Sequence, residues 1–344
     1  MPWVSSGEMT EERIHDTQMH ITEDAAADGS RIVPANTVLA VVRGMSLAKE
    51  FRVSITKRKM AFNQDLKAFA CEPDIESEFL FYALLARREH IRELATEASH
   101  GTKKLETQVL ASFPILVPRP DVQRRVVEII SAYDDLIENN RRRMALLEEA
   151  ARQLYREWFV RLRFPGHEHT RITHGVPEGW EFKSIGEVAT LNYGKALKEE
   201  NRLEGATPVY GSSGVVGSHS EALVSGPGIV VGRKGNVGSV FWSDTPFWPI
   251  DTVYFVSPEE SSLFLYHCLR QVPFQSSDVA VPGLNRTYAY SLKILMPIQR
   301  LRAEFEQATT PMFEQLTKLR TMNQKLRAAR DLLLPRLMNG EIDV

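Results

Sequence analysis

The chain has 344 residues, which exceeds a typical single domain and predicts about two domains. Its 42 Lys and Arg residues nearly balance its 44 Asp and Glu residues, and the formal net charge of -2 excludes a uniformly basic nucleic-acid binder. Any surface that binds nucleic acid must therefore come from local clusters of cations. Cys71 and Cys268 belong to no CxxC pair, and no apolar run has the length of a signal or a membrane span, so we expect a reduced, cytoplasmic protein.

Two segments of the chain repeat one another at a constant offset of 179. Residues 105–159 align without gaps on residues 284–338, and both contain a short apolar strand, a proline and a long heptad helix, in that order. Upstream the match is looser: 2–7 resembles 208–214, 38–44 (VLAVVRG) resembles 229–235 (IVVGRKG), and 79–82 resembles 263–266. The repeat predicts the α+β class, with two α/β-like globules, each followed by a long helix, in a pseudo-two-fold molecule.

The repeat also predicts the domain boundaries. They are a first globule at 1–118, a first long helix at 119–164, a linker at 165–176, a second globule at 177–298, a second long helix at 299–338 and a tail at 339–344. The second globule runs from 177 to 207 before it reaches PVYGSSG, whereas the first starts almost at its own PWVSSG. We therefore expect the first globule to lack its opening strands.

Each long helix has a period of seven with two seams. From Asp121 to about Phe164, one seam holds Gln123, Ile130, Ile137, Met144, Ala151 and Trp158, and the other holds Val126, Tyr133, Asn140, Leu147 and Leu154. In the second helix, an apolar seam holds Phe305, Met312, Leu319, Leu326 and Leu333, and a more polar seam holds Thr309, Leu316, Asn323, Arg330 and Leu337. Pro311 should start or kink this helix, and Pro335 should end it near Leu334.

Two matched heptad helices in one chain favour pairing with each other, and an antiparallel coiled coil is the simplest arrangement. Packing of each helix on its own globule is the alternative. The residues expected at the helix pair or at a partner subunit are Ile130, Tyr133, Ile137, Asn140, Leu147, Leu154, Trp158, Met312, Leu319, Leu326 and Leu333.

Three segments resemble a known family. Residues 131–168 (SAYDDLIENNRRRMALLEEAARQLYREWFVRLRFPGHE) and 330–344 (RDLLLPRLMNGEIDV) resemble the conserved regions of Type I restriction-modification specificity subunits. Residues 179–195 (GWEFKSIGEVATLNYGK) resemble the start of a target-recognition domain of such a subunit. The resemblance covers nearly the whole chain and departs from the family at the missing start of the first domain.

The resemblance implies that two target-recognition domains each read one half of a split site on double-stranded DNA. The paired helices would space the two domains and dock two modification (methyltransferase) subunits, and restriction or translocase subunits would complete the complex. S-adenosylmethionine, ATP and Mg would belong to those partners. The chain itself would have no cofactor and no catalytic residue, would be no enzyme, and would bind no membrane.

Local clusters of cations and small polar residues in the two globules are the candidate DNA contacts. In the first globule they are Arg43, Lys57, Arg58, Lys59, Lys103 and Lys104, and in the second they are Ser212, Ser213, Arg233, Lys234, Asn236, Arg286 and Tyr288. The alternative for 57–59 is a solvated surface turn. The alternative for the glycine-rich run 230–242 is a tight hairpin with exposed charge.

Motifs of enzymes and metal sites are weak or missing in this sequence. Residues 211–219 (GSSGVVGSH) lack the Gly-Lys-Ser/Thr of a Walker A loop, and 245–248 (TPFW) is not a methyltransferase motif. The Glu-x-Lys at 181–183 stands alone, and the linker histidines at 167, 169 and 174 have no cysteine beside them, so we expect no metal site. The competing functions are a coiled-coil scaffold that binds proteins and a nonfunctional, truncated specificity subunit.

Overall fold

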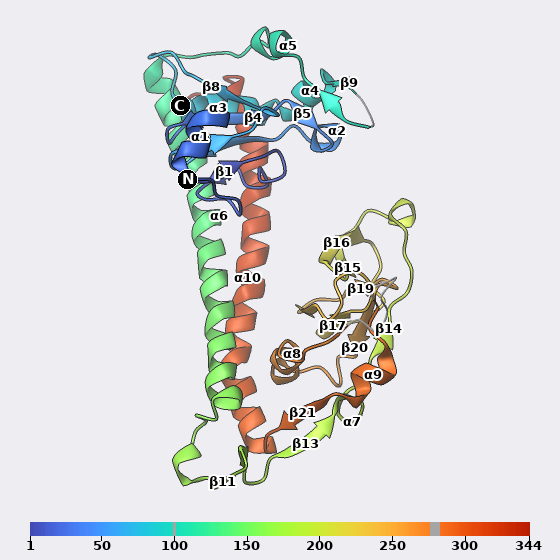
Figure 1. Ribbon diagram of the computed structural model, residues 1–344. Coiled ribbons are helices and arrows are strands. Elements are labelled where there is room, and N and C mark those ends of the chain that lie inside the picture. The colour runs from blue at the N-terminus through green and yellow to red at the C-terminus, as the bar shows by residue number, and fades with distance from the viewer. Residues whose placement is uncertain (99–100, 276–282) are drawn as a thin grey trace. The chain divides into compact units, whose positions relative to one another are not determined.

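The computed structural model describes residues 1–98, 101–275 and 283–344 and divides the chain into two compact units. Unit 1 comprises Met1–Asn139 and Met322–Val344, and unit 2 comprises Asn140–Thr321. Each unit holds one globule of mixed strands and helices together with one end of each long helix, α6 (Pro120–Tyr155) and α10 (Gln299–Met338) (Figure 1). The predicted fold of two globules, each followed by a long helix, is confirmed. No helix in the described ranges is both long and apolar enough to cross a membrane.

In the described part of unit 1, the strands form three small sheets. Their strand orders are β2-β6-β4-β8, β1-β7-β3 and β5-β10-β9. The elements before α6 are β1 (Trp3–Val4), β2 (Arg13–Ile14), α1 (Glu23–Gly29), β3 (Arg31–Val33), β4 (Val38–Val41), β5 (Arg43–Gly44), α2 (Ser46–Lys49), β6 (Val53–Thr56), β7 (Met60–Phe62), β8 (Leu66–Phe69), α3 (Ser77–Ala86), α4 (Arg88–Glu93), β9 (Thr96–Glu97), β10 (Lys103–Lys104) and α5 (Thr107–Ala111).

Unit 2 contains the strand orders β14-β20-β17-β18, β16-β15-β19, β13-β21 and β11-β12. After α6 come a π-helical turn η1 (Arg156–Val160), η2 (His167–His169), β11 (Ile172–Thr173), β12 (Val176–Pro177), β13 (Glu181–Ser184), α7 (Ile185–Val188), β14 (Asn192–Tyr193), η3 (Glu199–Asn201), β15 (Thr207–Gly211), β16 (Gly214–His219), β17 (Gly228–Gly232), β18 (Val240–Ser243), β19 (Trp248–Pro249), β20 (Val253–Val256), α8 (Leu263–Leu269), α9 (Arg286–Ser291) and β21 (Lys293–Met296).

One parallel strand pairing recurs in both units. Trp3 of β1 pairs in parallel with Ala61 of β7, and Val209 of β15 pairs in parallel with Trp248 of β19. The looser sequence match puts β1 and β15 in equivalent places. The long helices also begin at equivalent residues, because Pro120 and Gln299 are 179 positions apart. The internal repeat is therefore present in the backbone as well as in the sequence.

Unit 1 has no described counterpart of β13, α7 and β14, which open the globule of unit 2. In unit 2, β13 pairs along its whole length with β21. The equivalent of β21 in unit 1 is the segment 114–117, which forms no strand and leaves Leu116 58% and Val117 45% exposed. That the first globule lacks its opening strands stays a prediction.

The long helices run antiparallel to each other in both units. In unit 1, Val126 and Ile130 of α6 share a core with Leu334, Leu337 and Met338 of α10. In unit 2, the C-terminal end of α6 and the following η1 share a core with the N-terminal end of α10. The predicted antiparallel pairing is confirmed within each unit.

The buried line of α6 departs from a strict heptad. Asp134 is buried where Tyr133 was expected, Tyr155 where Leu154 was expected, and Phe159 of η1 where Trp158 was expected. A straight α-helix has 3.6 residues per turn, so it drifts relative to a repeat of 3.5, and each of these shifts is one residue towards the C-terminus. The heptad predicts the helix and its face, but it misplaces these three contacts by one position.

The buried face of α10 also differs from the prediction. The more polar seam is the more deeply buried one: Thr309, Leu316, Asn323, Arg330 and Leu337 are all buried. Met312, Leu326 and Leu333 of the apolar seam are only half-buried. Polar side chains can occupy a buried seam when each finds a partner, and Asn323 Nδ2 donates to the carbonyl oxygen of Ile137 on α6 at 3.2 Å.

The two prolines of α10 neither start nor end it. The helix begins at Gln299, twelve residues before Pro311, and continues through Pro335 to Met338. The carbonyl oxygen of Pro335 accepts a helical hydrogen bond from Asn339 N at 2.9 Å. An interior proline costs about 3 kcal/mol, whereas burial of one large apolar side chain stabilises by about 1.5–3 kcal/mol. Burial of Leu334, Leu337 and Met338 in the core of unit 1 outweighs the cost of Pro335.

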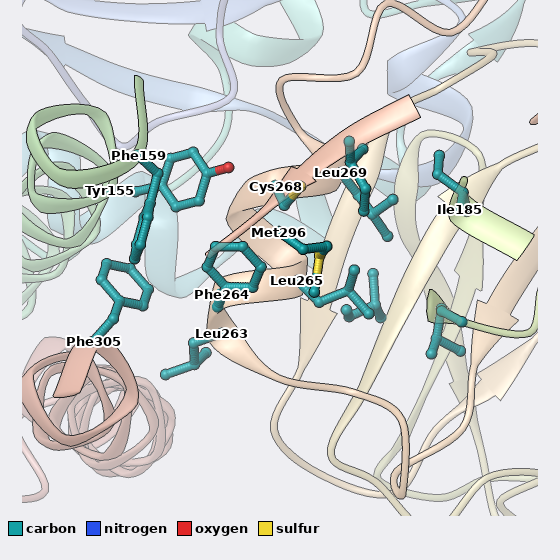
Figure 2. Close-up of a cluster of buried hydrophobic side chains, with 14 of the residues drawn as sticks. Tyr155, Phe159, Ile185, Leu263, Phe264, Leu265, Cys268, Leu269, Met296 and Phe305 are labelled. Carbon is teal, nitrogen blue, oxygen red and sulfur yellow. The ribbon is translucent and has the colours of Figure 1, made fainter. Parts of the chain in front are cut away.

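An aromatic cluster joins the globule of unit 2 to both long helices (Figure 2). The ring of Phe159 lies 4.9 Å from the ring of Phe264 on α8 and 5.3 Å from the ring of Phe305 on α10, measured between centroids. Tyr155 lies 5.9 Å from Phe264 and stacks on His267 at 5.7 Å. The edge-to-face pairs stabilise the packing beyond the area that they bury.

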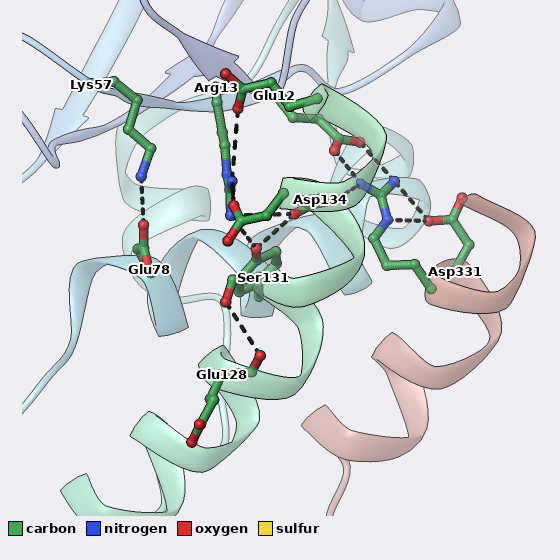
Figure 3. Close-up of polar contacts among 12 residues, drawn as sticks. Glu12, Arg13, Lys57, Glu78, Glu128, Ser131, Asp134 and Asp331 are labelled. Atoms are coloured by element: carbon green, nitrogen blue, oxygen red, sulfur yellow. Dashed lines mark hydrogen bonds and ion pairs between the residues drawn. The ribbon is translucent and has the colours of Figure 1, made fainter. Parts of the chain in front are cut away.

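An ion network joins the globule of unit 1 to both helices (Figure 3). Arg330 of α10 is 4% exposed; its Nη1 lies 2.6 Å from Asp134 Oδ1 of α6, and its Nη2 lies 2.9 Å from Glu12 Oε1. Tyr82 of α3 donates its hydroxyl to Asp134 Oδ2 at 2.6 Å, and Arg13 pairs with Asp135. Burial raises the pKa of the Tyr82 hydroxyl above its ordinary value, so this group stays a donor.

In each unit the long helix that follows the globule caps a helix of that globule. Gln123 Oε1 of α6 accepts from Glu76 N, at the start of α3, at 2.9 Å. Glu306 of α10 accepts from Leu263 N at 3.1 Å and from Phe264 N at 2.7 Å, at the start of α8. Side-chain oxygens at these positions satisfy backbone donors that the helix cannot satisfy itself. In both units a side chain of the long helix thus caps a helix of the globule, although the two side chains are not related by the offset of 179.

Candidate nucleic-acid interface

One backbone contact recurs in both units and places the cations. Leu105 N donates to Val42 O at 2.8 Å, and Leu284 N donates to Arg233 O at 2.7 Å. Next to these bonds, Lys104 pairs with Arg43 in unit 1, and Gly283 pairs with Lys234 in unit 2. Leu105 and Leu284 are both buried. Arg43 and Lys234 therefore occupy equivalent places, at the end of β4 in one unit and of β17 in the other.

Three of the candidate cations of unit 1 lie together. In the sheet β5-β10-β9, Lys104 stands opposite Arg43, and Lys103 stands opposite Gly44. Arg43 is exposed, and Lys104 Nζ lies 2.6 Å from Glu106 Oε1. No carboxylate of the described residues lies within 4 Å of Arg43 or Lys103. Glu97 of β9 stands opposite Lys103, so this edge holds three cations beside two carboxylates, Glu97 and Glu106, and has a small excess of positive charge.

The cations at 57–59 lie at the opposite end of the sheet. Because β4 and β6 are antiparallel, the residues after Thr56 lie at the start of β4, whereas Arg43 follows its end. Lys57 Nζ lies 2.6 Å from Glu78 Oε1 of α3, and Arg58 lies 3.8 Å from Asp16. Lys59 is exposed. The structure thus separates 57–59 from Arg43, Lys103 and Lys104 and gives two of its three cations an acidic partner.

In unit 2, Arg233 and Arg286 meet over one aromatic ring. Their guanidinium carbons lie 4.9 Å and 4.8 Å from the ring centroid of Tyr193 in β14. Arg233 also lies 5.7 Å from the ring of Tyr254 and donates Nη1 to Asp251 O at 3.1 Å. Burial raises the pKa of the Tyr254 hydroxyl, which donates to Leu284 O at 3.0 Å. Lys234 is exposed and lies 3.6 Å from Asp251.

The remaining candidates of unit 2 have different surroundings. Ser212 is half-buried, and its carbonyl oxygen accepts from Ser239 Oγ at 2.6 Å, which ties the segment at 212 to the β17–β18 turn. Ser213 is exposed at the β15–β16 turn, and Asn236 is exposed at the β17–β18 turn. Tyr288 lies in α9, where its ring packs against the core of unit 2. Its amide donates to Asn285 Oδ1 at 3.1 Å.

The residues predicted for the helix pair divide by burial. Ile130, Ile137, Asn140 and Leu319 are buried. The half-buried members are Tyr133, Leu147, Leu154, Trp158, Met312, Leu326 and Leu333. Of these, Leu147, Leu154, Trp158 and Met312 pack against the core of unit 2, and Leu333 packs against the core of unit 1. These contacts are internal to the chain.

Tyr193 is the residue of this interface that sequence reasoning missed. It lies between Asn192 and Gly194, and Lys195 follows. A Cβ at Gly194 would overlap the carbonyl oxygen of Ile250, so the backbone passes close to the sheet there. The sequence signal that could have indicated a binding role for Tyr193 is its place beside this glycine and near Lys195. The pairing of β14 with β20, which brings Tyr193 to Arg233, is not visible in the sequence.

Among the described residues, the linker histidines at 167, 169 and 174 belong to no cluster of three or more possible metal ligands. Within the described ranges, no group of three or more His, Cys, Asp or Glu side chains could hold a metal ion. Cys268 is buried in the core of unit 2, where burial raises the pKa of its thiol to about 11. A thiol with that pKa is neutral at pH 7 and lacks the thiolate that nucleophilic chemistry requires.

The chain was compared with known proteins. The family model of the Type I restriction modification DNA specificity domain matches residues 1–149 and 177–305. The specificity subunit of the Type I restriction enzyme MjaIX from Methanocaldococcus jannaschii is 24% identical over 382 residues, which cover 100% of this chain and 87% of the relative. The specificity subunit of the Type I restriction enzyme HindI from Haemophilus influenzae is 22% identical over 409 residues, covering 90% of this chain and 89% of the relative.

The fold is similar to that of a solved relative. The crystal structure of a Type I restriction-modification system S subunit from M. genitalium superposes with a TM-score of 0.54 at 18% identity, and the match covers 97% of this chain and 89% of that one. The first matched segment covers the globule of unit 1 and most of α6, and the second covers β13 to β21 of unit 2 and the start of α10. The chain belongs to the family of Type I restriction-modification specificity subunits.

Proposed function

We propose that the chain gives a Type I restriction-modification complex its DNA specificity, and that each of its two units reads one half of a split site on double-stranded DNA. The observation that carries this proposal is the backbone contact repeated at Leu105 and Leu284. It places a cation, Arg43 in unit 1 and Lys234 in unit 2, at the same position of both units. Two copies of one cationic edge suit two separate contacts with DNA. The family model, which matches both units, supports the same role.

Catalysis would then reside in partner subunits. The chain would supply no catalytic residue and no cofactor of its own. S-adenosylmethionine, ATP and Mg would be bound by modification and restriction subunits in the cytoplasm. We expect the purified chain to bind DNA without methylating or cleaving it when S-adenosylmethionine, ATP and Mg are added.

The long helices would dock the modification subunits. Their solvent-facing sides carry exposed apolar side chains, among them Leu146 of α6, which is 70% exposed, and Leu332 of α10, which is 74% exposed. Burial of such apolar side chains at a protein interface is favourable, because it removes them from water. Leu146→Lys and Leu332→Lys should reduce co-purification with the modification subunit, whereas Leu203→Lys, at a similarly exposed leucine outside the helices, should not.

The methylation pattern of DNA tests the proposal. The chain and its modification subunit are expressed together in cells that lack other methylation, and the methylated sites are mapped by sequencing. We expect two short half-sites at a fixed gap. The triple variant Arg43→Gln, Lys103→Gln, Lys104→Gln should weaken methylation and leave the second half-site unchanged. A single continuous motif, or methylation that does not depend on this chain, would contradict the proposal.

A further inference from the structure

Unit 2 holds two arginines against one exposed tyrosine. The Tyr193 side chain is 50% exposed, and its ring lies 5.2 Å from that of Tyr254, its partner in the pairing of β14 with β20. The guanidinium carbons of Arg233 and Arg286 lie 4.9 Å and 4.8 Å from the centroid of the Tyr193 ring. The two arginines come from segments 53 residues apart in sequence, so tertiary structure brings them together.

Hydrogen bonds hold both the backbone and the guanidinium group of Arg233 in place. Its amide donates to Thr252 O at 2.9 Å, its carbonyl oxygen accepts from Leu284 N at 2.7 Å, and its Nη1 donates to Asp251 O at 3.1 Å. Arg286 is the first residue of α9 and also lies 5.9 Å from the ring of Tyr290. Tyr290 is itself held, because its hydroxyl accepts from Leu191 N at 3.0 Å. The two charges are therefore placed by the fold before any ligand binds.

These two charges lack an acidic partner in the described part of the chain. No carboxylate there lies within 4 Å of Arg233 or Arg286, although the nearby Lys234 pairs with Asp251 at 3.6 Å. Elsewhere in unit 2, Arg320 does have acidic partners, because it lies 3.1 Å from both Asp244 and Glu148. Two guanidinium groups over one ring repel each other, and the ring offsets only part of that repulsion. The arrangement is therefore complementary to an anion.

Stacking on Tyr193 leaves the N–H edges of both arginines available. A guanidinium has five donors in its plane, and a ring that covers its face removes none of them. Arg233 uses one donor on Asp251 O. Donor edges from two arginines at one ring suit the oxygens of the DNA backbone phosphates, which accept such bonds at short range.

We propose that Arg233 and Arg286 bind the phosphate backbone of DNA as one clamp, and that Tyr193 is the positioning residue that holds both arginines in place. This inference rests on the proposed function. It assigns the two arginines to contacts that do not depend on base sequence. Exposed polar groups of the β17–β18 turn, such as Asn236, would then contact the bases.

Unit 1 lacks this clamp. The shared backbone contact makes Val42 the equivalent of Arg233, and the offset of 179 makes Thr107 the equivalent of Arg286. Neither residue carries a charge. Unit 1 should therefore lack the two phosphate contacts that the clamp gives to unit 2.

The experiment measures the affinity of the full chain for a fluorescent duplex of mixed sequence at several salt concentrations. Each phosphate contact contributes about 0.9 to the slope of log K against log salt concentration. Arg286→Gln should lower the slope by about that amount. Tyr193→Leu should lower it in the same direction, and Tyr193→Phe, which keeps the ring, should match the unchanged chain. The control is Arg270→Gln, because Arg270 lies over the ring of Tyr266, 5.5 Å from its centroid, elsewhere in the same unit.

The outcomes separate this inference from the proposed function. If the unchanged chain does not bind the duplex at any salt concentration, the proposed function fails. If it binds and Arg286→Gln keeps the full slope, the function stands and the clamp is wrong. A changed sequence preference with an unchanged slope, measured on a pool of random duplexes, would also overturn the clamp, because it would make the arginine a base reader. Equal losses for Tyr193→Phe and Tyr193→Leu would remove the positioning role of the ring.

Discussion

Arg330 of α10 and Asp134 of α6 form a buried ion pair in unit 1, with Nη1 2.6 Å from Oδ1. Removal of one partner leaves an uncompensated buried charge, which typically costs about 3–5 kcal/mol. Arg330→Met should therefore destabilise unit 1 by that order. Arg330→Met combined with Asp134→Leu should cost less than Arg330→Met alone. Hydrogen exchange at β4 in increasing urea reports on unit 1 and checks both values.

The matched control for this pair is Arg336→Met, at an exposed arginine of the same helix that lies 3.7 Å from Glu341. An exposed ion pair contributes at most about 1 kcal/mol, so this variant should remain close to the unchanged chain. If Arg330→Met and Arg336→Met had the same effect, the buried network would contribute no more than a surface pair.

Phe159 is predicted to be a main anchor of unit 2. Its ring contacts the rings of Phe264 and Phe305, and a buried phenylalanine replaced by alanine costs about 3–5 kcal/mol. Phe159→Ala should lower the unfolding free energy of unit 2 by that amount, measured by hydrogen exchange at β17. Leu146→Ala, at an exposed position of α6, should change it by less than about 0.5 kcal/mol. Similar losses in the two variants would show that the ring cluster is not the anchor.

Glu306 is predicted to hold the start of α8. Loss of a side-chain cap costs about 0.5–2 kcal/mol, and this carboxylate accepts from two backbone amides. Glu306→Ala should speed hydrogen exchange at Leu263 and Phe264 more than elsewhere in unit 2. Glu304→Ala removes a carboxylate two residues before Glu306 that pairs with Arg300, and it should leave those amides protected. Uniform loss of protection across the unit would instead indicate general destabilisation.

His267 should make unit 2 less stable in acid. Burial lowers the pKa of its imidazole to about 4, and the charge of Arg270 adds to the effect. In the unfolded chain a histidine has a pKa near 6.5, so between pH 6.5 and pH 4 the unfolded state binds more protons. The free energy of unfolding should fall as pH falls through that window, by on the order of 3 kcal/mol in total. Above pH 6.5 the imidazole is neutral in both states, and none of this stability is lost.

The variant that isolates this effect is His267→Phe, because the imidazole packs among Tyr155, Phe305 and Phe313. Its melting temperature should fall less between pH 6.5 and pH 4 than that of the unchanged chain. Parallel curves for the two proteins across this range would assign the acid sensitivity to other groups.

Much of the fold could be predicted from the sequence because it is local or repeated. The offset of 179 gives equivalent starts to α6 and α10, and the heptads identify their buried faces. The seams were less predictable. Taken alone, Asn323 and Arg330 are unfavourable in a core. They are accommodated because Asn323 donates to the carbonyl oxygen of Ile137 and Arg330 donates to the carboxylate of Asp134, which the sequence does not reveal. Pro335 signals a helix end locally, but packing in unit 1 outweighs that signal.

The candidate interface was less predictable than the fold. Charge and glycine content single out Arg233 and Arg286, but nothing near either residue in the sequence points to Tyr193, which lies 40 residues before Arg233. The run 57–59 looked like the densest cationic cluster, and its partners Glu78 and Asp16 come from distant segments. Whether a cation is neutralised depends on tertiary contacts, which composition does not record.

The ion network of unit 1 constrains the order in which the chain can fold during synthesis. Glu12 and Arg330 are separated by 318 positions in the sequence. Unit 1 consists of two segments, Met1–Asn139 and Met322–Val344, and the residues of unit 2 lie between them in the sequence. The ribosome releases residues 140–321 before the segment that completes the core of unit 1. The N-terminal globule must therefore wait with part of its apolar surface uncovered until α10 has emerged, and this interval is when the nascent protein is most exposed to aggregation.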